Sequence, residues 1–165
     1  MSEDFDLEFV PGTEAGEFDD QYVSETEDML RLKFEPDYLA FLEKHNGGVP
    51  KKQIFPLGDD EKVVERFLSF VPDYEDNEEF GYYDVAVVWS QISDRLNEYL
   101  IPFAIVYAGD FLCFDYEGGG EQAKIVLWNH DYSREMKPYT IPVADNFRQF
   151  LSMLYADDED GNSDE

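Results

Sequence analysis

Apolar residues recur at helical spacing in several parts of this chain. The clearest case lies near the C-terminal end, where Phe147, Phe150, Leu151 and Leu154 fall at positions i, i+3, i+4 and i+7. Serine, aspartate or proline before such a pattern is typical of a helix start, and glycine after it is typical of a helix end. We expect helices beginning at Ser24, at Pro36, near Asp84 and after Asp145, the second ending at Asn46, Gly47 and Gly48.

The segment after Asp84 has two interpretations. Residues 85–89 are rich in valine and resemble a strand by propensity alone. Over a longer window, Val85, Val88, Ile92 and Leu96 recur at intervals of three and four. This spacing favours a helix over residues 84–97.

Period-two patterns and turn residues predict strands elsewhere. We expect a turn at residues 58–61 and strands at residues 66–70, 102–107, 111–116, 123–128 and 139–142. Helices at the beginning, a meander of strands and a closing helix describe a single α+β domain. Its mainly antiparallel sheet would be packed on one side by N-terminal helices, a middle helix and a C-terminal helix.

Charge divides the chain into three parts. Residues 1–30 hold eleven acids and no base, and residues 156–165 hold six acids and no base. We therefore expect an acidic, mostly disordered arm at 1–22, a folded domain at 23–155 and an acidic disordered tail at 156–165. Apolar residues at every second position of residues 4–9 leave an alternative for the arm, since such a piece could add to a sheet edge or to a partner.

The formal net charge of −27 limits what the protein can bind. Residues 31–155 still hold twenty-two acids against twelve bases, so the folded part is acidic too. Such a surface repels nucleic acid and anionic membranes and attracts basic proteins. The single cysteine and an N-terminus without signal-peptide features indicate a cytoplasmic protein.

No residue pattern indicates catalysis. Cys113 could pair with His45 or His130 as nucleophile and base, but its place between Leu112 and Phe114 in an expected strand favours simple packing. Two histidines and one cysteine are too few for a convincing zinc site, and neither Gly81 nor Gly161 has the acids of a calcium loop around it. The glycines of residues 118–120 are flanked by acids that would repel a phosphate. We expect no catalytic residues, no metal and no cofactor.

Four motifs follow one another in a recognisable order. They are residues 36–42 running into 44–48, residues 101–104 continuing to 109–115, residues 126–131, and residues 143–147 continuing to 150–151. In these motifs and their order the chain resembles the SUKH superfamily, within the branch like the fungal cell-wall synthesis regulators. The turn at residues 106–110 is shorter than many members have, and the acidic arms are not part of the family pattern.

The resemblance implies a sheet with flanking helices and a binding module without known enzymatic chemistry. Bacterial members are typically immunity proteins that neutralise toxins, many of them nucleases, whereas the fungal branch is regulatory and scaffolding. The motif residues expected to have structural roles are Tyr38, Asn46, Gly47, Gly48, Gly109, Asp110, Trp128 and His130.

The densest acidic stretch of the folded part lies between Asp59 and Asp84, and tyrosines are interleaved with its acids. Acids alone usually form a solvated face, but tyrosine rings beside carboxylates can anchor a basic protein. The expected partner-binding residues are Asp59, Asp60, Glu61, Asp73, Tyr74, Glu75, Asp76, Glu78, Glu79, Tyr82 and Tyr83.

Two functions remain open from the sequence, and a third, an enzyme acting on a cationic substrate, is supported by the charge alone. The first is a non-catalytic immunity-type protein that neutralises a basic toxin domain such as a nuclease, acting as a monomer or a homodimer. The second is a regulatory scaffold of the cell-wall-regulator type, acting through protein–protein contacts of its acidic arms.

Overall fold

The computed structural model describes residues 7–107, 109–117, 123–135 and 137–156. The glycines at 118–120 and nearly all of the expected acidic tail lie outside these residues. The described elements are α1 (Asp20–Leu30), α2 (Pro36–Lys44), β1 (Ile54–Leu57), β2 (Asp60–Phe67), η2 (Gly81–Tyr83), α3 (Val85–Ile92), η3 (Ser93–Arg95), β3 (Leu100–Val106), β4 (Asp110–Asp115), β5 (Lys124–Trp128), β6 (Thr140–Ala144) and α4 (Phe147–Met153).

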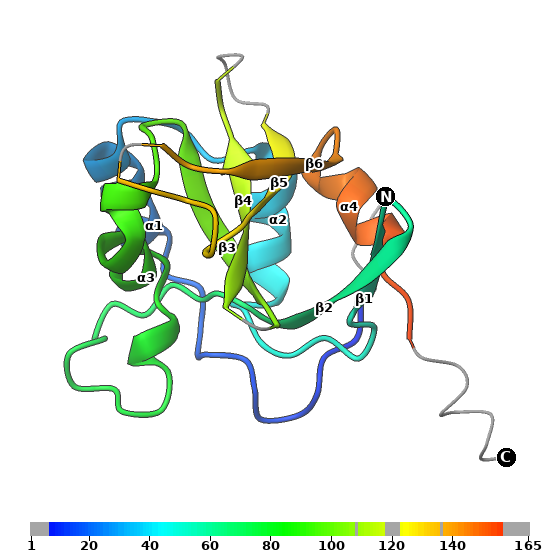
Figure 1. The fold of residues 1–165 in the computed structure, drawn as a ribbon. Helices are drawn as coiled ribbons and strands as arrows, with labels where there is room; N and C mark the ends of the chain where they lie inside the picture. Colours follow the sequence, from blue (N-terminus) through cyan, green and yellow to red (C-terminus); the bar gives the residue numbers. More distant parts are fainter. Residues whose placement is uncertain (1–6, 108, 118–122, 136, 157–165) are drawn as a thin grey trace, which may run out of the picture.

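The strands form one antiparallel meander (Figure 1). Their order in the sheet is β1-β2-β3-β4-β5-β6, so each strand pairs with the next one along the chain. The described chain is therefore an α+β fold with a six-stranded antiparallel sheet and α-helices before, within and after it, as the sequence predicts.

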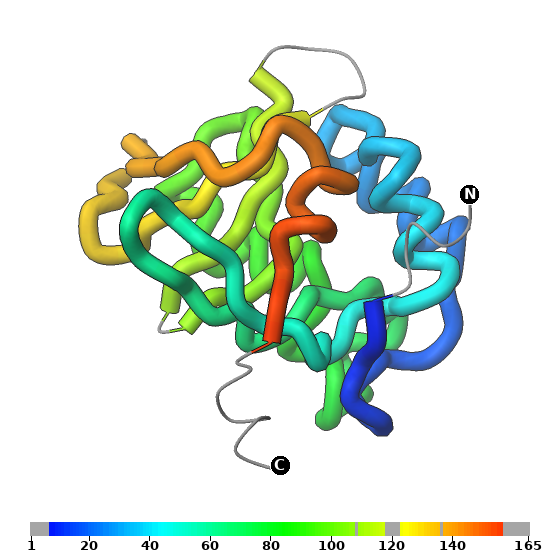
Figure 2. The backbone as a smooth tube through the Cα atoms, turned by 90° about the vertical axis from the view of Figure 1, so that its right-hand side faces the viewer, coloured from blue at the N-terminus to red at the C-terminus, as the bar shows by residue number. Residues whose placement is uncertain are grey.

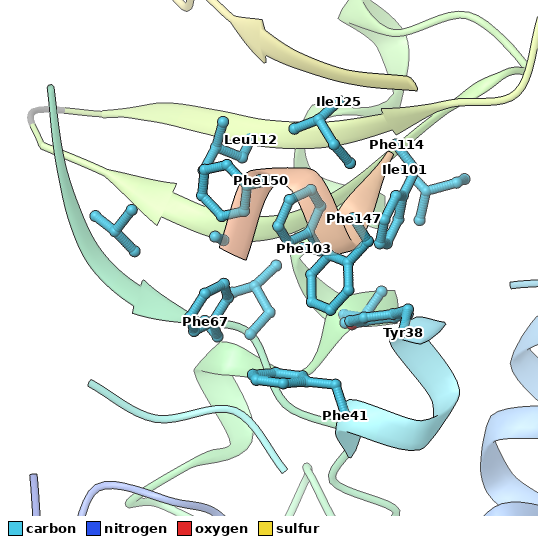
Figure 3. Close-up of a cluster of buried hydrophobic side chains, with 14 of the residues drawn as sticks. Tyr38, Phe41, Phe67, Ile101, Phe103, Leu112, Phe114, Ile125, Phe147 and Phe150 are labelled. Carbon is cyan, nitrogen blue, oxygen red and sulfur yellow. The ribbon is translucent and has the colours of Figure 1, made fainter. Parts of the chain in front are cut away.

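An aromatic core fills the space between one face of the sheet and helices α2 and α4 (Figure 3). Phe103 of β3 stacks on Phe114 of β4 with ring centroids 4.4 Å apart, and Tyr38 of α2 meets Phe114 edge-on at 4.7 Å. Phe147 of α4 packs edge-on against Tyr38 at 5.3 Å. Edge-to-face and offset contacts of this kind add to the stabilisation from apolar burial.

The opposite face of the sheet is also covered, which corrects the expectation of helices on one side only. Cys113 alternates with the main-core residues Leu112 and Phe114 on β4, so it points to the other face. Ile92 and Leu96, from α3 and the end of η3, belong to the same second apolar cluster as Cys113. Val85 and Val88 of α3 belong to the main core, so the segment from α3 through η3 contacts both apolar clusters.

Some predicted boundaries were wrong. The first helix begins four residues before Ser24, because the side chain of Asp19 accepts a hydrogen bond from the Tyr22 amide and caps it. Asn146, and not Asp145, caps α4 by accepting a bond from the Gln149 amide. The middle helix ends at Ile92 and continues as the 3-10 helix η3. β2 covers residues 60–67 rather than 66–70, and β1 was not predicted.

The described part of the N-terminal arm differs from the expected disordered segment. Phe9 is buried, forms an antiparallel bridge with Pro50 and stacks on His45 at 4.4 Å. The Val10 amide donates to the Val49 carbonyl at 2.8 Å. Figure 2 shows this start of the described chain, in dark blue, beside the segment that follows α2. Phe9, the last residue of the alternating segment at residues 4–9, therefore packs into the core of the same chain.

Candidate functional site

Residues 72–80, which we call the acidic loop, connect the end of the β2 region to η2. The loop contains five acids and no lysine or arginine, and all five acids are exposed. It closes on itself, because the Gly81 amide donates to the Asn77 carbonyl at 2.8 Å and the Phe80 amide donates to the Asn77 side chain at 2.9 Å. Exposed carboxylates are thus held on an ordered backbone.

Gly81 permits the close approach that shapes this loop. A Cβ atom at position 81 would collide with the carbonyl oxygen of Tyr74. The two ends of the acidic loop can therefore approach this closely only with glycine at position 81.

The buried carboxylate of Asp84 ties the loop to two helices. It accepts hydrogen bonds from the Val71 amide at 2.8 Å, from the Val87 amide at 3.1 Å and from the Tyr22 hydroxyl at 3.0 Å. Burial raises the pKa of Asp84, although these hydrogen bonds act in the opposite direction. One side chain therefore caps α3, holds the start of the acidic loop and fixes α1.

Arg66, one of two bases within the acidic stretch, lies inside the molecule. Its guanidinium lies 4.1 Å from the centroid of the Tyr83 ring and donates to the Thr13 carbonyl at 3.0 Å. Burial lowers the pKa of Arg66. Arg66 also lies 5.9 Å from the centroid of the Phe80 ring, so its buried charge lies behind the acidic loop. Tyr83 is partly buried against it.

Two adjoining hollows lie beside α1 and α3, the first next to the acidic loop and the second next to η3 and the start of β3. The first, of about 520 Å³, is lined by Met29, Tyr74, Glu75, Asn77, Glu78, Gly81, Tyr82, Ala86, Val87, Trp89 and Ser90. The second, of about 490 Å³, is lined by Met29, Leu30, Arg31, Trp89, Ser93, Leu96, Asn97, Glu98, Tyr99 and Ile101. Because Met29 and Trp89 line both, we treat them as one depression, the α1–α3 groove.

The structure divides the predicted binding residues between two places. Tyr74, Glu75, Glu78 and Tyr82 line the groove, and Asp73, Asp76 and Glu79 are exposed on the same acidic loop. Asp59, Asp60 and Glu61 lie instead at the turn of the β1–β2 hairpin, on the opposite side of the molecule from the acidic loop (Figure 1). Glu61 accepts a bond from the Tyr155 hydroxyl at 2.6 Å.

Several groove residues were not predicted from the sequence. Met29 is 51% exposed although it belongs to an amphipathic helix, and Trp89 is partly buried on α3. An exposed methionine is a weak signal of a contact surface. Nothing in the sequence connects position 29 with position 89.

The predicted motif at residues 46–48 joins the loop after α2 to the chain after β2. The Asn46 side chain donates to the Phe70 carbonyl at 2.9 Å and accepts from the Phe70 amide at 2.8 Å. Gly47 and Gly48 have positive φ values of 78° and 119°. Gly48 exchanges two backbone hydrogen bonds with Phe67, so the three residues act as a backbone clasp.

The other motif residues join the β3–β4 turn to the end of β5. The Asp110 carboxylate lies 2.6 Å from Nδ1 of His130 and accepts from the His130 amide at 3.0 Å. Gly109, with a φ of 107°, lies against the same imidazole ring. Trp128 is fully buried, and its indole N–H donates to the Arg95 carbonyl at 3.1 Å.

Comparison with known proteins identifies the family. A family model described as SUKH_6, SMI1-KNR4 cell-wall, matches residues 20–151. The chain belongs to the SUKH family. One relative with a known sequence, the SPbeta prophage-derived uncharacterized protein YokK of Bacillus subtilis (strain 168), is 28% identical over 97 residues. That match covers 59% of this chain and 44% of YokK, so the aligned region is less than half of the relative.

The three candidates for a nucleophile and its base, Cys113, His45 and His130, are all held within the fold of this SUKH chain. His45 lies 3.0 Å from Glu14, and Cys113 is fully buried. Burial raises the pKa of the Cys113 thiol, which disfavours the reactive thiolate. Within the described ranges, no group of three or more His, Cys, Asp or Glu residues is placed to hold a metal ion. The same part of the chain contains no helix with the length and apolar character needed to cross a membrane.

Proposed function

We propose that this SUKH-family chain is a non-catalytic immunity-type protein that binds and neutralises a cognate toxin with a basic surface. The family includes immunity proteins, which makes this class the first to consider. The observation that carries the proposal is the acidic loop beside the α1–α3 groove. It combines exposed carboxylates with two exposed tyrosines, Tyr74 and Tyr82. Such a surface offers anchors and charge to a basic protein.

A nuclease fits this surface as a partner. An enzyme that binds nucleic acid presents lysine and arginine to the phosphates. The exposed carboxylates of the acidic loop can pair with these same basic side chains in place of the phosphates. Opposite charges on the two proteins also speed their encounter, by a factor that falls as salt is added. The proposal includes a cytoplasmic location, where an immunity protein would meet an incoming toxin.

Binding and neutralisation can be tested together. The full chain would be tagged and used to capture partners from the lysate and the secreted fraction of the source organism. A single basic toxin domain, bound one-to-one and inactive while bound, is the expected result. A captured protein whose activity is unchanged in the complex would contradict neutralisation.

We predict that the acidic loop controls the rate of association. Replacing Asp76, Glu78 and Glu79 by Asn, Gln and Gln should lower the association rate constant at low salt by roughly 10-fold or more and flatten its dependence on ionic strength. Stopped-flow or surface-plasmon measurements over a salt series provide the readout. The matched control replaces the exposed hairpin acids Asp59, Asp60 and Glu65, which changes the net charge equally. Equal slowing in both triple variants would show that total charge matters and the loop does not.

A second function is favoured by the family description, which names cell-wall proteins. In that case the chain is a regulatory scaffold, and its acidic ends bind several endogenous partners. Removing residues 1–6 and 157–165 separates the two functions and keeps Phe9, which packs in the core. The shortened chain should still neutralise a toxin if it is an immunity protein, whereas a scaffold would lose its partners.

A further inference from the structure

The α1–α3 groove is built before any partner arrives. The walls of its first hollow are two helices and the closed acidic loop, and Asp84 hydrogen-bonds to all three parts or to their immediate ends. The left-handed backbone of Arg31 ends α1 and donates to the Asp28 carbonyl at 3.3 Å. A groove with walls fixed in this way binds with a smaller ordering cost than a flexible surface would.

The two halves of the groove differ in charge. The first hollow holds Glu75 and Glu78 and has no lysine or arginine among its lining residues. The second hollow holds Arg31 as well as Glu98, and its other walls include Leu30, Leu96 and Ile101. The first half therefore favours a cation, and the second favours an uncharged apolar side chain.

Aromatic rings decide which cation fits the first hollow best. Tyr74, Tyr82 and Trp89 line it together with two carboxylates. A planar guanidinium can stack on such rings and bind carboxylates with two parallel hydrogen bonds, whereas an ammonium is a strongly hydrated point charge. The methylene stem of the side chain can pack on Met29, Ala86 and Val87.

We infer that the α1–α3 groove binds one segment of the toxin, which places an arginine in the first hollow and an apolar side chain in the second. This inference rests on the proposed function, and it names the chemistry that the partner must present. A second copy of this chain is disfavoured as the occupant, because two copies each carry a net charge of −27 and would bring like charges together.

A small probe tests the groove without the toxin. The full chain would be titrated with acetyl-arginine methylamide and with acetyl-citrulline methylamide, the uncharged analogue of nearly the same shape, and followed by NMR. The indole N–H signal of Trp89 should shift in a saturable way with the arginine probe, while that of the buried Trp128 stays in place. The citrulline probe should bind at least about 3-fold more weakly, since it lacks the charge. No shift at Trp89, or equal binding of both probes, would overturn the inference.

Matched variants locate the binding energy. Glu75→Gln with Glu78→Gln should weaken the arginine probe by about 3- to 10-fold, and Tyr82→Ala by about 3-fold. The control, Asp59→Asn with Asp60→Asn, removes the same charge from the hairpin and should leave the affinity unchanged. Thermal unfolding of each variant shows that it is folded. An equal loss in the hairpin control would assign the effect to net charge and contradict the groove.

The same variants separate the two proposals once a toxin is captured. A toxin that is neutralised equally well by the wild type and by the Glu75/Glu78 variant leaves the proposed function standing and rejects the groove as its site. Failure to neutralise any toxin rejects the proposed function, whereas the arginine titration still decides whether the groove binds a guanidinium. If the Glu75/Glu78 variant loses affinity for the toxin and the hairpin control does not, the result supports both the proposed function and the groove as its site.

Discussion

Tyr38 lies at the centre of the aromatic core, and its hydroxyl group finds no hydrogen-bond partner among the described residues. Its side chain is 1% exposed, and burial raises the pKa of its phenol. A buried unpaired hydroxyl loses its hydration without compensation. We predict that Tyr38→Phe raises the free energy of unfolding by about 1 kcal/mol, measured by urea denaturation.

Tyr116 provides the matched comparison for this prediction. It is also buried, but its hydroxyl accepts a hydrogen bond from the Glu35 amide at 3.2 Å. Tyr116→Phe should therefore lower the free energy of unfolding by about 1 kcal/mol. Destabilisation by both substitutions would mean that the Tyr38 hydroxyl has a partner in solution. It would also point to a role for that tyrosine beyond ring packing.

At the scale of elements, the clasp at residues 46–48 connects the loop after α2 to the chain that leaves β2. A Cβ atom at Gly47 would collide with the Ser69 hydroxyl and lie 2.7 Å from the Leu68 carbonyl oxygen. The position also has a φ of 78°, where other residues are strained. We predict that Gly47→Ala lowers the free energy of unfolding by about 3 kcal/mol or more.

Gly58 separates the two contributions to that loss. It also has a positive φ, of 62°, but a Cβ atom there would meet nothing within 4 Å. Gly58→Ala should therefore cost only the backbone strain, about 1 kcal/mol. Equal losses at the two positions, measured by denaturant unfolding, would contradict the steric part of the argument.

The predictability of each element depended on how many signals the chain supplied. The start of α2 was predicted correctly because Pro36 suits the first turn of a helix and is followed by apolar residues at helical spacing. The start of α1 was predicted wrongly, because Ser24 and Glu27 have the spacing of a capping box, whereas the structure uses Asp19 as the cap. β1 is only four residues long and contains Pro56, so its identity as a strand comes from pairing with β2.

At the scale of the whole molecule, residues that are close in the sequence of the predicted site lie apart in the fold. The acids between Asp59 and Asp84 form one stretch in the sequence, but β2 spans roughly 26 Å of extended chain between the hairpin turn and the region of the acidic loop. The acids of the loop could be predicted as a group. Met29 and Trp89, which share the groove, are brought together only by the tertiary fold.

The stability of the whole molecule should depend on pH through Glu35, which is 3% exposed and links two helices. It precedes α2, and its side chain accepts a hydrogen bond from the Phe147 amide, the first residue of α4, at 3.4 Å. Burial raises the pKa of Glu35 above its ordinary value of 4.5. The folded protein therefore holds this proton more tightly than the unfolded chain does. The resulting stability is complete below the ordinary glutamate pKa and is lost as the pH rises through the higher, folded-state pKa.

We therefore predict that Glu35→Gln, which imitates the protonated form, is more stable than the wild type at about pH 7.5, and that this advantage shrinks toward about pH 4.5. Urea unfolding at both pH values, with enough salt to screen surface repulsion, gives the comparison. Glu43→Gln is the control, since Glu43 lies exposed on α2 and its substitution changes the net charge equally. A stability difference that does not change with pH would show that Glu35 acts through shape or hydrogen bonding. In that case, the cost of a buried charge would not set the pH response of this fold.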